Sequence, residues 1–213
     1  MIHLIFIDSV VKDSDLLRAH INPGAIAHSI AKNINGIEYI AQTLVAQRRS
    51  LTDKKKRTTK RTTDITISIV AHGRPGVLEL GNAVLSMASL RTYRDRIQKW
   101  FSSTPLDICS CDRLQLYSGD TAGTESQELL HGLHQVTYAT VYAFTPQSGK
   151  SQKWNNWQLD TVVNTWNKRL FPLFGHMQTP PPQYPFNLKN IAAYSTILTV
   201  PVGNTRTDKL LPT

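Results

Sequence analysis

One short run constrains the fold of this chain more than any other part of it: residues Ile65 to Gly76, which read ITISIVAHGRPG. The run begins with β-branched side chains, which favour a strand buried in a sheet. It then leads directly into His72 and Gly73. Open α/β sheets place their functional groups at the carboxyl ends of their strands, so the sequence predicts that His72 lies at a functional edge.

Strand and helix patterns alternate through the first two thirds of the chain. We expect strands at 2–7, 25–29, 64–71, 114–117 and 138–144, helices at 36–47, 87–101 and 124–133, and a hairpin of 77–80 with 83–85. This order predicts an α/β fold with a mainly parallel sheet, helices on both faces and a small hairpin after the His-Gly loop. Right-handed crossovers then place His72 and Ser118 at strand ends on one edge.

Several short motifs occur in a fixed order between residues 2 and 160. They are LIFIDS at 4–9, NGIE at 35–38, AHGRPG at 71–76, LGN at 80–82, YSGD at 117–120 with Gly123 and Glu125 downstream, and a Trp-x-Leu at 157–159. In this order they resemble the bacterial family called domain of unknown function 4347, which is similar to the caspase-like (clan CD) cysteine peptidases. The resemblance implies a caspase-like fold, with a histidine and a cysteine at neighbouring strand ends.

The same resemblance assigns roles at the predicted edge. His72 matches the histidine that acts as general base or orienting partner for a cysteine thiolate, and Gly73 follows it. The cysteine position falls on Gly119, which has no side chain and cannot attack a carbonyl. Ser118 is the nearest hydroxyl, but in an extended strand its side chain turns away from the pocket. Asp120 either bonds to His72 or, as is usual for Asp before a helix, caps the helix that follows.

The chain has two cysteines, Cys109 and Cys111, separated by one residue. A shifted alignment, in which LDICSCD ends the strand, would make Cys111 or Cys109 the nucleophile beside His72. The pair could also offer zinc ligands together with His131 and His134, but the spacing matches no standard zinc module. The two cysteines provide no disulfide framework. Because the spacing fits no standard zinc module, we expect no metal, and we expect no cofactor.

Most of the positive charge lies in one segment, 48–63, which reads RRSLTDKKKRTTKRTT. It holds one carboxylate and eight cations, and so supplies +7 of the chain's net charge of +9; the cations are Arg48, Arg49, Lys54, Lys55, Lys56, Arg57, Lys60 and Arg61. The pattern predicts a solvated loop that can bind polyanions, including nucleic acid, with steep salt dependence. Because it enters the strand at 64–71 from the end opposite His72, its anchor is expected at the other edge of the sheet.

The length of 213 residues supports one main domain. We expect a caspase-like domain at 1–160, with the basic insertion at 48–63, and a C-terminal extension rich in proline and aromatic residues at 161–213. Within that extension, 191–200 could add an edge strand or pair with another chain. No signal peptide or membrane span is readable, so the expected location is the cytoplasm.

Taken together, these features predict a caspase-like domain that has lost peptidase activity and acts as a binding or accessory module for a protein or peptide partner. One alternative is a cysteine-type peptidase that uses His72 with Cys111 or Cys109. A serine hydrolase that uses Ser118 is a weaker version of the enzymatic reading. The remaining alternative is polyanion or nucleic-acid association through the basic segment.

Overall fold

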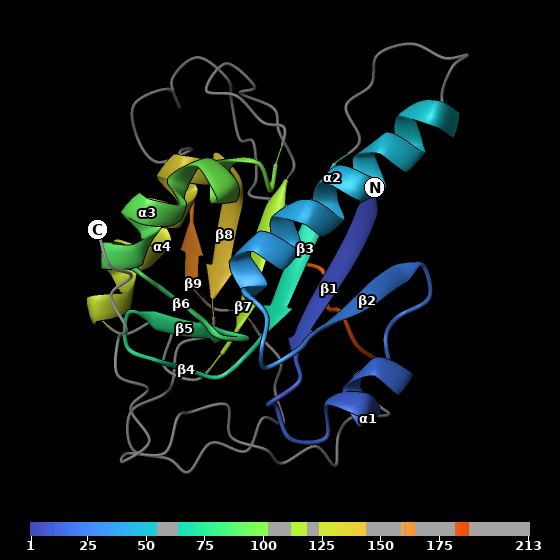
Figure 1. The fold of residues 1–213 in the computed structure, drawn as a ribbon, viewed down its shortest axis with the longest axis horizontal. Coiled ribbons are helices and arrows are strands. Elements are labelled where there is room, and N and C mark those ends of the chain that lie inside the picture. The colour runs from blue at the N-terminus through green and yellow to red at the C-terminus, as the bar shows by residue number, and fades with distance from the viewer. Residues whose placement is uncertain are drawn as a thin grey trace.

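The computed structural model describes residues 1–54, 64–101, 112–118, 124–143, 159, 161–164 and 182–187. Within them, the main sheet has six strands in the order β2–β1–β3–β7–β8–β9 (Figure 1). The strands are β1 Ile2–Asp8, β2 Ala25–Ile30, β3 Ile65–Val70, β7 Arg113–Tyr117, β8 Thr140–Ala143 and β9 Thr161–Val163. All neighbouring pairs are parallel except β8 with β9. The predicted mainly parallel α/β fold is confirmed.

Three helices cover one face of this sheet: α2 Gly36–Lys54, α3 Met87–Gln98 and α4 Thr124–Thr137. Their apolar side chains form a single core with the strand residues that face them; its members include Leu4, Ile40, Ile67, Ile97, Leu116 and Leu133. The opposite face carries the short helix α1 Ser14–Ala19 and a smaller core; its members include Ile5, Ile7, Leu17, Val70, Tyr117 and Phe186. Helices therefore lie on both faces, as the sequence predicted.

Local capping explains where two of the helices begin. The Asn35 side chain accepts hydrogen bonds from the backbone N–H groups of Ile37 and Glu38, both at 3.1 Å, at the start of α2. Ser86 precedes α3 and forms a reciprocal capping box with Ser89. These polar side chains satisfy backbone donors that a helix leaves free in its first turn, and so fix the first residues of both helices.

A small antiparallel sheet follows His72 directly. It consists of β4 Gly73–Arg74, β5 Val77–Leu80 and β6 Ala83–Ser86, so the expected hairpin is present and has one additional short strand. Leu78, Leu80 and Leu85 are fully buried in the core on the helix side. The hairpin is therefore packed into the domain rather than projecting from it.

Helix α2 is longer than the sequence pattern predicted. It continues to Lys54 instead of ending at residue 47, so the expectation of a loop from residue 48 is wrong for residues 48–54. The added part of the helix begins with a tertiary contact, because the Arg48 guanidinium donates hydrogen bonds to the backbone carbonyls of Lys99, at 2.8 Å, and Trp100, just after α3. Burial lowers the pKa of Arg48, and the charge of Asp112 acts in the opposite direction.

Replacing Arg48 with glutamine is expected to lower the free energy of unfolding by about 2 kcal/mol, because two carbonyls after α3 lose a charged donor. Arg94→Gln, on the exposed side of α3, removes the same charge and should change stability by less than about 0.5 kcal/mol. Urea denaturation of both variants measures the difference. Equal stability of the two variants would show that Arg48 is only a surface cation.

Two pieces of the chain beyond residue 160 join the folded domain. β9 pairs with β8, and residues 182–187 pack beside the loop that follows α1. There the Asn22 side chain donates to the backbone carbonyls of Tyr184, at 2.8 Å, and Phe186, at 3.2 Å, and the Phe186 side chain is buried. The segment expected as a C-terminal extension thus contributes to the sheet and to the second core, whereas the expected edge strand at 191–200 lies outside the described residues.

Candidate functional site

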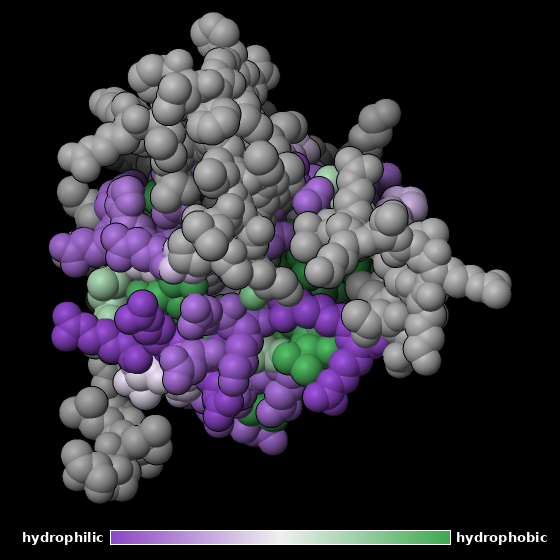
Figure 2. All heavy atoms as spheres, turned by 90° about the horizontal axis from the view of Figure 1, so that it is seen from above, coloured by the Kyte–Doolittle hydropathy of each residue, from purple (hydrophilic) through white to green (hydrophobic). Residues whose placement is uncertain are grey.

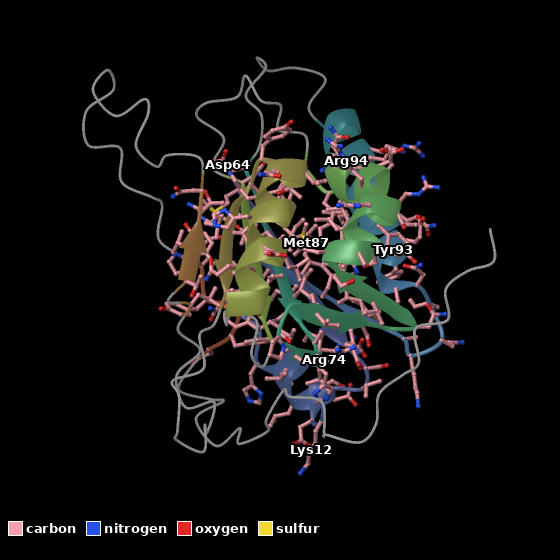
Figure 3. All side chains as sticks on the ribbon, turned by 90° about the vertical axis from the view of Figure 1, so that its left-hand side faces the viewer. Lys12, Asp64, Arg74, Met87, Tyr93 and Arg94 are labelled. Carbon is pink, nitrogen blue, oxygen red and sulfur yellow. The ribbon has the colours of Figure 1, made fainter. Side chains whose placement is uncertain are left out.

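The carboxyl ends of the central strands lie at one edge of the sheet. β1 sits between β2 and β3, so the chain leaves β1 toward one side of the sheet and later returns on the other side. Open parallel sheets bind ligands at such a switch point. Figure 3 shows Lys12 and Arg74 at this edge and Asp64 at the opposite one. We refer to it as the carboxyl edge.

Strands β3 and β7 end side by side at the carboxyl edge. Val70 pairs with Tyr117 in parallel register, and the backbone N–H of Ala71 donates to the Tyr117 carbonyl at 3.2 Å. His72 and Ser118 therefore follow neighbouring strand ends, as the sequence predicted. Gly119 and Asp120 lie outside the described residues, so their place beside His72 stays a prediction.

The loop that carries His72 is fixed through its backbone. The His72 carbonyl accepts a hydrogen bond from the Glu79 N–H at 2.9 Å, and the Gly76 N–H donates to the Ser126 hydroxyl of α4, also at 2.9 Å. The ring is half-buried, and its Nδ1 atom is buried without a hydrogen-bond partner in the described part of the chain. A general base needs such a partner to set its tautomer and orientation, so the described residues place an imidazole here without the partner that would orient it.

Gly73, the first residue of β4, is in direct contact with Ser118, which follows β7. A Cβ at Gly73 would lie 2.1 Å from Ser118 Oγ and 2.8 Å from the Val77 carbonyl oxygen, so this position accepts only glycine. Leu116 belongs to the core on the helix side and Tyr117 to the opposite core. Continuing that alternation puts Ser118 on the helix side, where it is fully buried. Its hydroxyl packs against β4 and is not presented to solvent.

A second fixed point of the carboxyl edge is the carboxylate of Asp8 at the end of β1. It accepts hydrogen bonds from the Gly81 N–H at 2.7 Å and the Val10 N–H at 2.9 Å. Gly81 has a φ of +61°, and a Cβ there would lie 2.1 Å from the Ile34 carbonyl oxygen. The Asn82 N–H donates to that same oxygen at 2.8 Å. Asp8 thus ties the turn of the hairpin to the end of β1.

Three of the sequence motifs meet at this junction. LIFIDS supplies Asp8, LGN supplies the turn, and NGIE supplies Gly36. A Cβ added to Gly36 would lie only 2.8 Å from the Cβ of Leu80, so glycine is needed for the hairpin to pack here. These motifs are separated by many residues in sequence but form one set of backbone contacts. Their shared role is to hold the hairpin, and with it the loop of His72, against the sheet.

A row of polar side chains that the sequence did not single out crosses the sheet on the face opposite α2, α3 and α4. His3 Nε2 lies 2.8 Å from Ser68 Oγ, and that hydroxyl donates to Gln115 Oε1 at 2.8 Å, so the row joins β1, β3 and β7. Ser68 and Gln115 are fully buried. Burial, followed by the charge of Arg113, lowers the pKa of His3 to about 4. Only the strand register, which pairs Ser68 with Gln115 and places His3 two residues away on the same face, could have revealed this row.

The partly buried His3 makes the stability of the fold depend on pH. Because the pKa of His3 is lowered from 6.5 to about 4, the unfolded chain binds a proton in this interval that the folded chain does not. The contribution of His3 to the free energy of unfolding should therefore be largest above pH 6.5 and should fall as the pH drops toward 4. Burial also lowers the pKa values of His28 and His134, which act in the same direction. Denaturation curves at about pH 7.5 and about pH 5 measure this loss of stability. His3→Asn should make the loss smaller. A wild type whose stability does not change between the two pH values would contradict the prediction.

The remaining predicted site residues lie either at the opposite, amino edge of the sheet or outside the described residues. Asp112, which follows Cys111 in sequence, accepts a hydrogen bond from the Ile65 N–H at 2.8 Å, at the amino ends of β3 and β7. Cys109 and Cys111 themselves lie outside the described residues. Arg48, Arg49 and Lys54 belong to α2 at this amino edge, and the cations Lys55, Lys56, Arg57, Lys60 and Arg61 also lie outside them.

Two further findings limit the chemistry of the described residues. Among them, no group of three or more His, Cys, Asp or Glu side chains is placed to hold a metal ion. The helices in the same ranges include none that is long and apolar enough to cross a membrane.

Comparison with known protein families gives a match. A family model described as "Domain of unknown function (DUF4347)" matches residues 4–179, which include all the strands of the main sheet except the first residues of β1. The match also extends past residue 160 and through β9. No curated protein matches the chain.

Proposed function

The chain belongs to the DUF4347 family, and from this premise we propose that it is a caspase-like module without peptidase activity that acts by binding a protein or peptide at the carboxyl edge. The observation that carries the proposal is the contact between Gly73 and Ser118. It joins the loop of His72 to the end of β7 and uses the nearest hydroxyl for packing. Residue matching then leaves Gly119, without a side chain, at the family's nucleophile position.

The shifted-nucleophile alternative requires Cys111 or Cys109 to reach His72. Asp112 marks the amino end of β7, whereas His72 follows the carboxyl end of β3, and the two strands run parallel. The full length of β7, five residues, separates these ends. Strand rise is about 3.3 Å per residue, so a nucleophile near Asp112 would stand about 15 Å from the loop of His72. Direct attack needs contact at about 3 Å, which favours the non-catalytic reading.

A binding role also explains why an inactive domain would keep its loop geometry. The Asp8 carboxylate, the Gly81 turn and the bond from Gly76 to Ser126 hold the loop in place without any catalytic group. A rigid loop at a switch point provides a pre-organised surface, which lowers the entropic cost of binding. The exposed residues Arg74 and Pro75 lie on this loop and would be part of that surface.

Peptide cleavage tests the proposal. Purified full-length protein should leave a library of fluorogenic peptides uncleaved, and His72→Ala, Cys109→Ala and Cys111→Ala should each behave like the wild type. If the wild type cleaves peptides and loses this activity with His72→Ala and with either cysteine variant, the shifted-nucleophile peptidase replaces the proposal. Thermal melts of each variant confirm that the comparison is made between folded proteins.

A further inference from the structure

A second surface, far from the carboxyl edge, gathers exposed positive charge from two helices. Arg91, Arg94 and Lys99 are exposed along α3 and just after it, and Arg49 is exposed near the end of α2. We call these four residues the α2–α3 basic surface. Figure 2 looks onto the edge at which α2 ends, where hydrophilic side chains surround smaller hydrophobic patches among the described residues. Figure 3 shows Arg94 near this edge and Lys12 at the opposite one.

Two side-chain contacts hold the helices of this surface together. The Arg48 guanidinium donates to the carbonyls of Lys99 and Trp100, and Arg96 Nε lies 2.8 Å from Glu38 Oε1. Arg48 and Arg96 are thus occupied in holding α2 against α3. The basic surface consists of other cations, which are exposed on the two helices or just after α3, and the exposed Asp95 lies among them.

In the part of the chain whose side chains are described, this surface offers charge without a large exposed apolar side chain. The large hydrophobic side chains that are exposed, where burial is described, are Met1, Val10, Leu16, Ile26 and Val162, and none of them lies on residues 36–49 of α2 or on α3. A membrane-binding helix needs such side chains to enter the lipid, and a stable protein interface needs a buried apolar centre. Exposed cations without apolar anchors suit the regularly charged phosphate backbone of a nucleic acid.

We propose that the α2–α3 basic surface binds the phosphate backbone of double-stranded nucleic acid without sequence specificity. This activity is independent of the proposed binding at the carboxyl edge, and it extends the polyanion contact expected for the basic segment to residues of α3. Such binding releases condensed counterions, so the logarithm of the association constant falls by about 0.9 for each phosphate contact per decade of salt concentration.

The test measures binding of a labelled random-sequence DNA duplex to full-length protein at several salt concentrations. The double variant Arg91→Gln/Arg94→Gln should bind about tenfold more weakly at moderate salt and should lower the salt slope by about 2. The control Lys12→Gln/Lys32→Gln removes the same charge from exposed positions near the carboxyl edge and should leave the slope unchanged. A thermal melt of each variant excludes unfolding as the cause.

Several outcomes would overturn the inference. Equal losses in the α3 variant and the control would show that net charge, rather than this surface, drives binding. Binding of the wild type to vesicles with anionic headgroups, but not to the duplex, would identify a membrane surface instead. Duplex binding with no salt dependence would contradict the phosphate mechanism. None of these results bears on peptide cleavage, so this inference and the proposed function fail separately.

Discussion

Replacing Gly81 with alanine is expected to lower the free energy of unfolding by about 4 kcal/mol, which is a fall of about 10 °C in Tm. Gly81 has a φ of +61°, and its added Cβ would stand 2.1 Å from the Ile34 carbonyl oxygen. The left-handed backbone costs an alanine about 1 kcal/mol, and the remainder comes from moving the backbone of the loop before α2. Thermal and urea unfolding measure both quantities.

Gly24 provides the matched control. It also has a positive φ, +87°, but an added Cβ would meet nothing within 4 Å. Gly24→Ala should therefore cost only the backbone contribution, about 1 kcal/mol. If the two variants lose the same stability, the contact between the hairpin turn and the loop before α2 does not exist as described.

The second large effect is expected at Asp8. Asp8→Ala removes the acceptor for two backbone N–H groups, the buried one of Gly81 and the partly buried one of Val10. We expect a loss of about 3 kcal/mol in the free energy of unfolding, since hydrogen bonds to a charged group contribute more than neutral ones. Chemical denaturation at neutral pH measures it.

The same substitution at an exposed carboxylate separates this contact from a general effect of charge. Asp15 forms a 3.8 Å ion pair with Arg18 while its side chain is 97% exposed, so Asp15→Ala should change stability by less than about 0.5 kcal/mol. A small loss at both positions would mean that the hairpin is held by its apolar core alone, without the carboxylate of Asp8.

Much of the fold could be predicted from sequence because its signals are local. The strands of the central sheet are short apolar runs, and Gly81 and Asn82 between two such runs indicate a hairpin turn. The part of α2 beyond residue 47 could not be predicted, because its contact with the rest of the domain includes the hydrogen bonds from Arg48 to the carbonyls after α3. That contact depends on the packing of two helices and leaves no periodic pattern.

The candidate site was predictable only in part. Parallel alternation of strands and helices placed His72 and Ser118 at neighbouring strand ends, and the structure confirms this. The LIFIDS motif contains Asp8, but the hydrogen bond from Gly81 to Asp8 spans 73 positions and can be seen only in the fold. The row of His3, Ser68 and Gln115 depends on strand register, which a single sequence does not determine.

The central proposal is that the carboxyl edge keeps a peptidase-like arrangement without a nucleophile. Its most direct test is labelling by a peptide-based thiol trap, measured by the intact mass of the protein. The wild type should gain no His72-dependent label. Gly119→Cys, in a background with Cys109→Ala and Cys111→Ala, should gain one equivalent and lose it when His72→Ala is added. Labelling of wild-type Cys111 or Cys109 that depends on His72, or no labelling of the Gly119→Cys variant, would contradict the account.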